Sequence, residues 1–377
     1  MNAMTRSRRA GMALPMVLGA IVIVGTLITG VMYLATQEYR VGANTLNEAR
    51  AESAAELGLN RLTSDWDQSK NTSMVTGDTL RVSYTDVGGA SVNVFVTRLA
   101  GPFFWAVSEA QTRGNSLQYG SRRRFGSLFR LNTPALNFLG AVTAAGNVKA
   151  SGNVTVSGND ANPSGWACST TLTNVPGAVL SPTATVTFNG VATVSGNPPY
   201  TTNVAANDTN TYFNYGGLSY SSLAALANIT LGSGTYNGMG PVVNAGVCQK
   251  TNTSNWGDPV RHTPAAACES DFPIIHITGD AHLSTGAGQG ILLVDGDLTE
   301  SGNFSFTGVV IVRGTIRSSG NSNAVIGVEM AAAVDLGDAV TLSGSTNIQY
   351  SSCAVQQVLS ASSNLTTAKG RAWVNLY

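Results

Sequence analysis

The chain has 377 residues, and its 21 Lys and Arg residues balance 21 Asp and Glu residues. Charged residues make up only 11% of the chain, hydrophobic residues make up 43%, and 42 residues are Gly. The apolar content excludes a disordered chain, and the absence of a Gly at every third position excludes collagen. The balanced charge gives no reason to expect a nucleic-acid partner.

The charge is distributed unevenly, which indicates two regions. Residues 1–132 carry fourteen basic and nine acidic residues, a net charge of +5, whereas residues 133–377 carry seven and twelve, a net charge of −5. Few charges together with many Gly, Asn, Ser, Thr and β-branched residues are typical of an exported, mainly-β region. We therefore expect a domain boundary near residue 132.

A transmembrane helix is predicted over residues 12–36. These 25 residues contain no charge, and Arg6, Arg8 and Arg9 stand just before them. As a helix the run spans about 38 Å, and the hydrocarbon core of a bilayer is about 30 Å thick. The positive-inside rule then places residues after 36 outside the cytoplasm. A cleaved secretory signal peptide is the alternative, but its apolar region is about 7–15 residues long.

The helix is predicted to continue outside the membrane over residues 37–70. Leu46, Ala49, Ser53 and Leu57 recur at helical spacing. They form a narrow stripe of mostly small residues, which suits close packing on a sheet or on neighbouring helices.

The residues RSRRAGMALPMVLGAIVIVG, positions 6–25, resemble the start of type IV pilins, and most closely that of PilX-type minor pilins. The resemblance implies that a prepilin peptidase removes residues 1–11 by cleaving between Gly11 and Met12, and that Met12 is then N-methylated. It also implies other pilins as partners of the N-terminal helix. One departure is Met16, which occupies the fifth position of the mature chain, where most pilins carry a Glu. Related subunits without that charge resemble tip or initiating components.

Residues 71–132 are predicted to form a small antiparallel β domain. Strand-like runs occupy 78–87, 90–100, 103–113 and 118–132, with turn signals such as Gly88-Gly89 between them. Within the last run, the consecutive residues 122–124 are all Arg. Adjacent strand residues face opposite ways, so we interpret them as charges on a solvated edge strand.

A six-residue repeat dominates the second half. Its clearest stretch has Gly at 290, 296, 302, 308, 314 and 320, and most of the hexads have an apolar third residue. Positions three and five of a hexad share one face of a short strand, and Gly permits a sharp corner. Three such sides close a coil of about eighteen residues, which predicts a parallel β-solenoid over 133–359.

The repeat also gives the solenoid its register. Phe304 and Val310 are expected inside, Thr307 outside, and Glu300 at a core-facing position. Asn or Asp after a corner Gly is expected to stack in a ladder. The strict left-handed hexapeptide signature is absent, so a right-handed β-helix is favoured, and a β-sandwich is the alternative fold. Residues 160–189 and 198–275 lack the repeat and are expected to form long loops.

The C-terminal residues 360–377 are expected to cap the open end of the solenoid, because apolar residues there recur at helical spacing. Phrases such as FPIIHITGD, GILLVDGDLTESGN and YSSCAV also resemble the β-helical C-terminal regions of PilX-type proteins. The predicted fold class is therefore α+β, with a long transmembrane helix, a small antiparallel β-meander and a mainly-β parallel solenoid.

Four cysteines, Cys168, Cys248, Cys268 and Cys353, all follow the membrane segment. An even count in an oxidising compartment predicts two disulfides, for which three connectivities exist. Closure of one polar loop favours Cys248 with Cys268, leaving Cys168 with Cys353. Zinc bound by Cys248, Cys268 and His262 is the alternative, but the paired short spacing of a zinc site is missing.

A catalytic role is a further alternative, because right-handed β-helices include polysaccharide-active enzymes. Asp295, Asp297 and Glu300 lie near His276 and His282 in the sequence, and two carboxylates are the usual groups for glycoside hydrolysis. Asp-Gly-Asp is also a common corner, so a local bulge or coil end is the preferred explanation. Calcium on the two aspartates is a further alternative. We expect no enzyme activity, no cofactor and no metal.

The sequence thus predicts a minor pilin-like structural subunit of a type IV pilus or related secretion machine. It is expected in the inner membrane with its C-terminal part exported, and later in the pilus or at the cell surface. A surface adhesin or carbohydrate-binding module, with loops at 198–275 touching a surface glycan or protein ligand, is the alternative.

Overall fold

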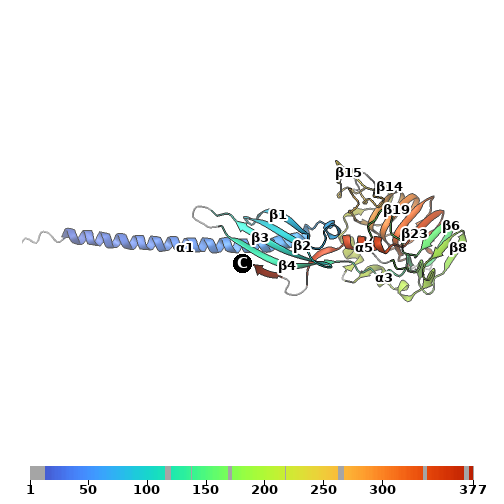
Figure 1. Ribbon diagram of the computed structural model, residues 1–377, viewed down its shortest axis with the longest axis horizontal. Helices are drawn as coiled ribbons and strands as arrows, with labels where there is room; N and C mark the ends of the chain where they lie inside the picture. The colour runs from blue at the N-terminus through green and yellow to red at the C-terminus, as the bar shows by residue number, and fades with distance from the viewer. Residues whose placement is uncertain are drawn as a thin grey trace, which may run out of the picture.

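The computed structural model describes residues 13–114, 120–136, 138–168, 172–216, 218–261, 267–333, 338–368 and 373–376. Its first element is α1 (Ala13–Ser64), a single helix of 52 residues. The first half of α1 stands free of the rest of the molecule, and the second half lies along an antiparallel sheet (Figure 1). The residues between β4 (Arg122–Asn132) and β24 (Asn364–Thr367) form a second body beyond that sheet (Figure 1).

The antiparallel sheet starts with four strands joined in chain order, which confirms the predicted meander. They are β1 (Thr79–Val87), β2 (Ala90–Arg98), β3 (Phe103–Thr112) and β4 (Arg122–Asn132), preceded by the short helix α2 (Lys70–Ser73). Alternate residues of β2 are buried against Ala54, Ala55 and Leu62 of α1. A Cβ on Gly58 would lie 2.6 Å from the Val92 side chain, so Gly at this position lets helix and sheet approach closely.

The C-terminal residues complete this sheet. β24 (Asn364–Thr367) and β25 (Trp373–Leu376) both pair antiparallel with β4. The expected cap at 360–377 is therefore wrong: Leu365 packs into the core of the sheet. The apolar spacing that resembled a helix also fits short strands. The antiparallel module thus combines residues from both ends of the chain, and the coils are inserted between β4 and β24.

The inserted residues form coils whose strands pair in parallel, which is incompatible with the hairpins of a β-sandwich. Ile274 pairs with Ile291, Ile291 with Val309, and Val309 with Val328, so successive coils are 17, 18 and 19 residues long. We call this body the coil stack. The parallel pairing agrees with the predicted repeat, whereas the handedness of the winding stays a prediction.

The strands lie on three sides of the coil stack. The first side contains β13 (Ile229–Leu231), β17 (Ile274–Ile277), the ends of β18 (Ala281–Val294), β19 (Leu298–Val312) and β21 (Asn323–Ala331), then β5 (Val142–Ala144), β7 (Ala178–Leu180) and β10 (Tyr200–Thr202). The second contains β14 (Gly234–Met239), the starts of β18 and β19, β20 (Ile316–Ser318), β22 (Asp338–Leu342), the start of β6 (Asn147–Ser157) and β8 (Val186–Gly190). The third contains the remaining parts of β14, β18, β19, β21 and β6, with β23 (Ser345–Gln349) and β9 (Thr193–Ser195).

The order of the coils differs from the order of the chain. Along the first side the strands follow β13, β17, β18, β19, β21, β5, β7 and β10. The chain therefore enters the stack in its middle, winds to one end, crosses to the other end and winds back to meet its first coil. Segments 160–189 and 198–275, expected to be loops, supply β7, β8, β10, β13 and β14 despite lacking the repeat.

The first side is covered on its outer face as well. The crossing segment carries a 3₁₀ turn (Val204–Asn207), α3 (Thr209–Phe213), the hairpin of β11 (Asn214–Tyr215) and β12 (Leu218–Ser219), and α4 (Tyr220–Ala225). Its Tyr212, Tyr215 and Leu223 and residues of α5 (Ser352–Ala361) join Ile291 and Val309 in a second apolar cluster. Strands buried on both faces read as continuous apolar runs, as GILLVD and GVVIVR do.

The predicted register holds for the interior residues Phe304 and Val310, which are both buried in the stack core. Thr307 was expected at the surface, but only 4% of it is exposed, so that expectation is wrong. Its partner in the preceding coil, Gln289, donates to the carbonyl oxygens of Cys268, Glu269 and Asp271. The segment around Cys268 therefore covers the outer face of the stack at Gln289, one coil away from Thr307.

Corner side chains connect successive coils. Asp280 Oδ1 accepts the N–H of Asp297 at 2.9 Å, and Asp297 Oδ1 accepts the N–H of Thr315 at 2.8 Å. Asn147 Oδ1 accepts the N–H of Thr185 in the same manner at 2.8 Å. At these three corners an Asx side chain thus binds the backbone of a neighbouring coil, while stacking of one Asx side chain on another stays a prediction.

Candidate functional site at the junction of the two modules

The antiparallel module and the coil stack meet where the chain leaves β4 and returns to β24. Asn71 holds this junction, because its buried Nδ2 donates to the carbonyl oxygens of Ala361 at 2.9 Å and Ser363 at 2.7 Å. Its Oδ1 accepts from Trp66 Nε1 at 2.7 Å. Nothing in the sequence pattern singled out Asn71, since its partners are about 290 residues away.

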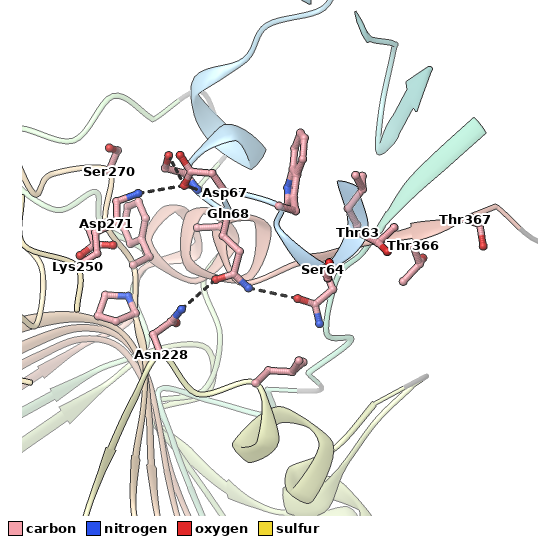
Figure 2. Close-up of a pocket in the computed structure, with 18 of the residues that line it drawn as sticks. Thr63, Ser64, Asp67, Gln68, Asn228, Lys250, Ser270, Asp271, Thr366 and Thr367 are labelled. Atoms are coloured by element: carbon pink, nitrogen blue, oxygen red, sulfur yellow. Dashed lines mark hydrogen bonds and ion pairs between the residues drawn. The ribbon is translucent and has the colours of Figure 1, made fainter. Parts of the chain in front are cut away.

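A polar cleft of about 830 Å³ opens on one side of the junction (Figure 2). Lys250 Nζ reaches Asp67 Oδ1 at 3.0 Å, linking a loop of the coil stack to the end of α1. Gln68 bridges the cleft by donating to Asn364 Oδ1 at 3.2 Å and accepting from Asn228 Nδ2 at 3.4 Å. These contacts involve three separate parts of the chain and orient the modules relative to each other.

Two carboxyl groups in this cleft have shifted pKa values. Partial burial raises the pKa of Asp67, but hydrogen bonds from Ser69 and the Lys250 ammonium outweigh it and hold the pKa below its ordinary value. Burial dominates at Asp271 and raises its pKa, although Lys250 and a hydrogen bond from Asn255 oppose the shift. Lys250 thus acts on two carboxyl groups, Asp67 with a lowered pKa and Asp271 with a raised pKa.

A second cleft, of about 550 Å³, lies next to the first and shares Ser270 and Phe272 with it. Its charged lining residues are Arg98 from β2, and Arg261 and Glu269 from the loop region of the coil stack. Arg98 stacks over Phe104, with Cζ 4.4 Å from the ring centroid, and burial lowers the pKa of its guanidinium. Arg261 stacks over Trp166 at 4.7 Å and pairs with Glu269 at 3.3 Å.

Both predicted disulfides are confirmed. Cys168 is bonded to Cys353 with their Cα atoms 5.8 Å apart, and Cys248 to Cys268 with theirs 5.1 Å apart. Bonded cysteines supply no thiolate for zinc, which contradicts the zinc alternative, and His262 lies outside the described residues. Cys168–Cys353 also lines the second cleft.

The carboxylates weighed for catalysis do not converge. Asp295 pairs with His276 at 3.0 Å on the outer surface, whereas His282 contacts Ser301 at 2.8 Å on another side of the stack. Asp297 is held by its corner contacts and by Arg317 at 3.0 Å. Within the described part of the chain, no three His, Cys, Asp or Glu residues gather as a metal site. The corner interpretation of Asp-Gly-Asp agrees with this arrangement.

Two acids lie inside the coil stack. Glu300 faces the core, as predicted, and burial raises its pKa to about 7. Glu329 is equally buried, and burial together with the nearby Glu300 raises its pKa well above the ordinary value. Glu329 was not predicted from the sequence, although its place between the outward-facing Val328 and Met330 in the run GVEMAA is a usable signal.

The three consecutive arginines are paired, and the edge-strand expectation for them is wrong. β4 lies between β3 and β25. Arg122 and Arg124 pair with Glu109 on one face, and Arg123 pairs with Glu48 of α1 on the other. The arginines therefore do face opposite ways, as the strand geometry required.

One helix in the described residues is long and apolar enough to cross a membrane. It is α1, with a mean hydropathy of 2.3 over its most apolar window, none of which is buried. Met16 lies in this exposed part, whereas the predicted processing residues Gly11 and Met12 lie outside the described residues.

Comparisons with known proteins give little support for an assignment. No protein-family model matches the chain, and no curated protein matches it. Among solved structures, the chain is similar to the competence-associated pilin ComZ from Thermus thermophilus, with 11% sequence identity and a TM-score of 0.24. The alignment covers 88% of this chain and 97% of that one. A similarity at this level carries no argument about fold or function.

Proposed function

We propose that the chain is a membrane-anchored structural subunit of a type IV pilus or a related secretion machine. The observation that carries this proposal is the two-part nature of α1. Its first half is uncharged and exposed, and its second half packs on an antiparallel sheet that also binds the C-terminal strands. An exposed apolar helix of this length requires lipid or neighbouring helices. The resemblance of residues 6–25 to pilins favours lipid as the first environment of this helix and neighbouring pilin helices as the later one.

The proposal includes processing at the N-terminus. A prepilin peptidase would cleave after Gly11 and methylate Met12, with the anchor in the inner membrane and the later location in the pilus or at the cell surface. Intact mass of the membrane-extracted protein tests this directly. Gly11→Val is expected to block cleavage without preventing insertion, while Gly19→Val serves as the control because a Cβ there meets nothing within 4 Å. A mature chain starting at Met1, or after Ala35, contradicts the proposal.

Met16 supports a finer proposal, that this PilX-like minor subunit lies at the filament tip. A subunit with no neighbour above it needs no carboxylate at the fifth mature position. Met16→Glu adds a charge in the bilayer at about 2.5–3.5 kcal/mol on insertion scales. It is expected to impair function or leave it unchanged, without raising abundance. Immunogold labelling along the whole shaft would contradict a tip position.

A role as a surface adhesin is the second candidate. It is favoured by the residues of segment 198–275 that line both clefts at the junction. Deleting the gene separates the two roles: loss of pili indicates an assembly subunit, and loss of adhesion with intact pili indicates an adhesin. We propose no catalytic role, in keeping with the separation of Glu300 from Asp295 and the two histidines.

A further inference from the structure

The second cleft contains a half-buried cation without an acidic partner. Other arginines at partly buried positions pair with carboxylates, as Arg123 does with Glu48 and Arg261 with Glu269. Within the described residues, no carboxylate pairs with Arg98, which contacts the Phe104 ring and donates to the carbonyl oxygen of Asn71 at 3.4 Å. Partial burial of an unpaired charge is costly, so an anion from outside the chain would stabilise Arg98.

Arg98 and Arg261 belong to different modules but line the same cleft of about 550 Å³. Arg261 brings a second guanidinium, and its buried Nε has no hydrogen-bond partner among the described residues. Glu269 neutralises one of the two positive charges, because its carboxylate lies 3.3 Å from Arg261. The charged lining thus sums to +1, which matches a monovalent carboxylate better than a divalent phosphate ester.

The remaining lining is suited to neutral hydroxyl groups. Thr72, Ser73, Gln356, Gln357 and Ser360 present hydroxyl and amide groups around the two arginines. The volume falls within the range of about 300–1,000 Å³ that is typical of small-molecule sites. A sugar ring that carries a carboxylate satisfies both the charge and the hydroxyl-binding groups, and guanidinium binds carboxylate through two parallel hydrogen bonds.

We propose that the cleft lined by Arg98 and Arg261 binds an acidic saccharide through the carboxylate of a uronic acid residue. Arg98 supplies the main charge-assisted contact, and the hydroxyl and amide groups orient the sugar. Both modules contribute to the site, so it exists only when they are docked at the junction. The inference goes beyond the proposed pilus role and does not depend on it.

Calorimetric titration of the full chain in detergent micelles tests the proposal, with tetragalacturonate as the probe and neutral galactotetraose as the matched control. Tetragalacturonate is expected to bind, at least tenfold more tightly than galactotetraose. Arg98→Gln should weaken binding at least tenfold, because it removes a charge-assisted hydrogen bond. Arg113→Gln, which removes an exposed positive charge from the end of β3, should leave binding unchanged.

Several outcomes overturn the proposal. They are no binding of tetragalacturonate, equal binding of galactotetraose, tighter binding of inorganic phosphate than of the uronate, and equal effects of Arg98→Gln and Arg113→Gln. If Arg98→Gln fails to fold, as judged by circular dichroism, Gln356→Ala provides the test at an exposed rim residue. That variant is expected to weaken binding of tetragalacturonate about threefold while leaving the urea midpoint unchanged, and undiminished binding would also overturn the proposal.

Discussion

The antiparallel sheet and the coil stack bury their apolar residues according to different rules. In β3, Phe104 is fully buried against α1, whereas its neighbour Phe103 is 37% exposed on the open face. In β18, the four consecutive residues 291–294 are all fully buried. The difference arises because the sheet has one covered face and the first side of the stack has two. Alternation of apolar and polar residues therefore indicates a strand with one covered face, whereas a continuous apolar run indicates a strand that is covered on both faces.

The two regions also treat carboxylates differently. Glu109 lies on the open face of the sheet, where burial raises its pKa but hydrogen bonds from Arg122 and Arg124, together with their positive charges, outweigh burial and lower the pKa below its ordinary value. Glu329 lies inside the stack, where no arginine reaches it among the described residues and its pKa is raised. The predictions below test these contrasts, starting with the largest expected effect.

Phe304→Asp should destabilise the coil stack by about 4–6 kcal/mol, since it removes a buried ring and leaves an unpaired charge in the core. Phe95→Asp on the open face of β2 should cost only about 1 kcal/mol. Urea unfolding followed by tryptophan fluorescence measures both. Thr307→Asp should also lower the free energy of unfolding, because Thr307 is buried. Equal effects at Phe304 and Phe95 would contradict the difference between core and open face.

Gly308→Ala should destabilise the stack by about 2–4 kcal/mol through strain and overpacking. Gly308 has φ of +142°, and a Cβ there would lie 2.1 Å from the carbonyl oxygen of Gly290 in the preceding coil. Gly89 is the control: its φ is +81°, but a Cβ would meet nothing within 4 Å. Gly89→Ala should cost about 1 kcal/mol. Thermal unfolding of both variants measures the contribution of coil stacking.

Glu329→Gln should make the chain less sensitive to alkaline pH. The folded-state pKa values of Glu329 and Glu300 are raised, so their contribution to stability is present below the unfolded pKa of 4.5 and is lost as pH rises toward about 7. The variant should therefore be about 1–3 kcal/mol more stable than the wild type at pH 8 and nearly unchanged at pH 4.5.

Urea midpoints at several pH values measure this effect, with Glu109→Gln as the control. Because the pKa of Glu109 is lowered, its contribution to stability is present above its unfolded pKa and is lost only as pH falls. A wild-type chain whose stability does not decrease between pH 5 and pH 8 would show that Glu329 is ionised without penalty.

Lys250→Ala should have the smallest effect, at most about 1 kcal/mol, because its ion pair with Asp67 is about half exposed and screened by salt. The substitution should also raise the pKa of Asp67 toward its ordinary value, because the Lys250 ammonium helps to lower it. A carboxyl NMR titration measures this pKa. Docking of the modules should survive, since Asn71 holds the junction independently. Separation of the modules in small-angle scattering would show that Lys250 has a larger role.

Local rules predicted much of the fold. Three sequence features each reflect a constraint within one element, so they could be recognised in a single sequence. They are the uncharged run over residues 12–36, the alternation of apolar and polar residues in β2, and the six-residue spacing of Gly from 290 to 320. The even cysteine count predicted two disulfides, and the polar loop between Cys248 and Cys268 favoured the pairing that is observed. β24 could not be predicted, because a four-residue strand is specified mainly by the partner strand, here β4, that lies far away in the chain.

The candidate site was less predictable for the same reason. Asn71 and Arg98 belong to the antiparallel module and Arg261 belongs to the coil stack, and no sequence spacing connects the three. Glu300 could be placed because the hexad fixed its direction. Thr307 was misplaced because the hexad gives its outward direction but does not show that its outer face is covered. Sequence periodicity gives the direction of a side chain within its coil, but it does not say what lies beyond that coil.

The entry of the chain into the middle of the coil stack has a consequence for folding during synthesis. β5 and β6 are made early, but the strands that pair on their other side belong to residues 329–349. β4 likewise waits for β24 and β25. Both bodies therefore keep an open strand edge until these late segments have been made, and an open edge can pair with another chain. A chain terminated before residue 329 would expose both edges at once, so it is expected to aggregate more readily than the full chain.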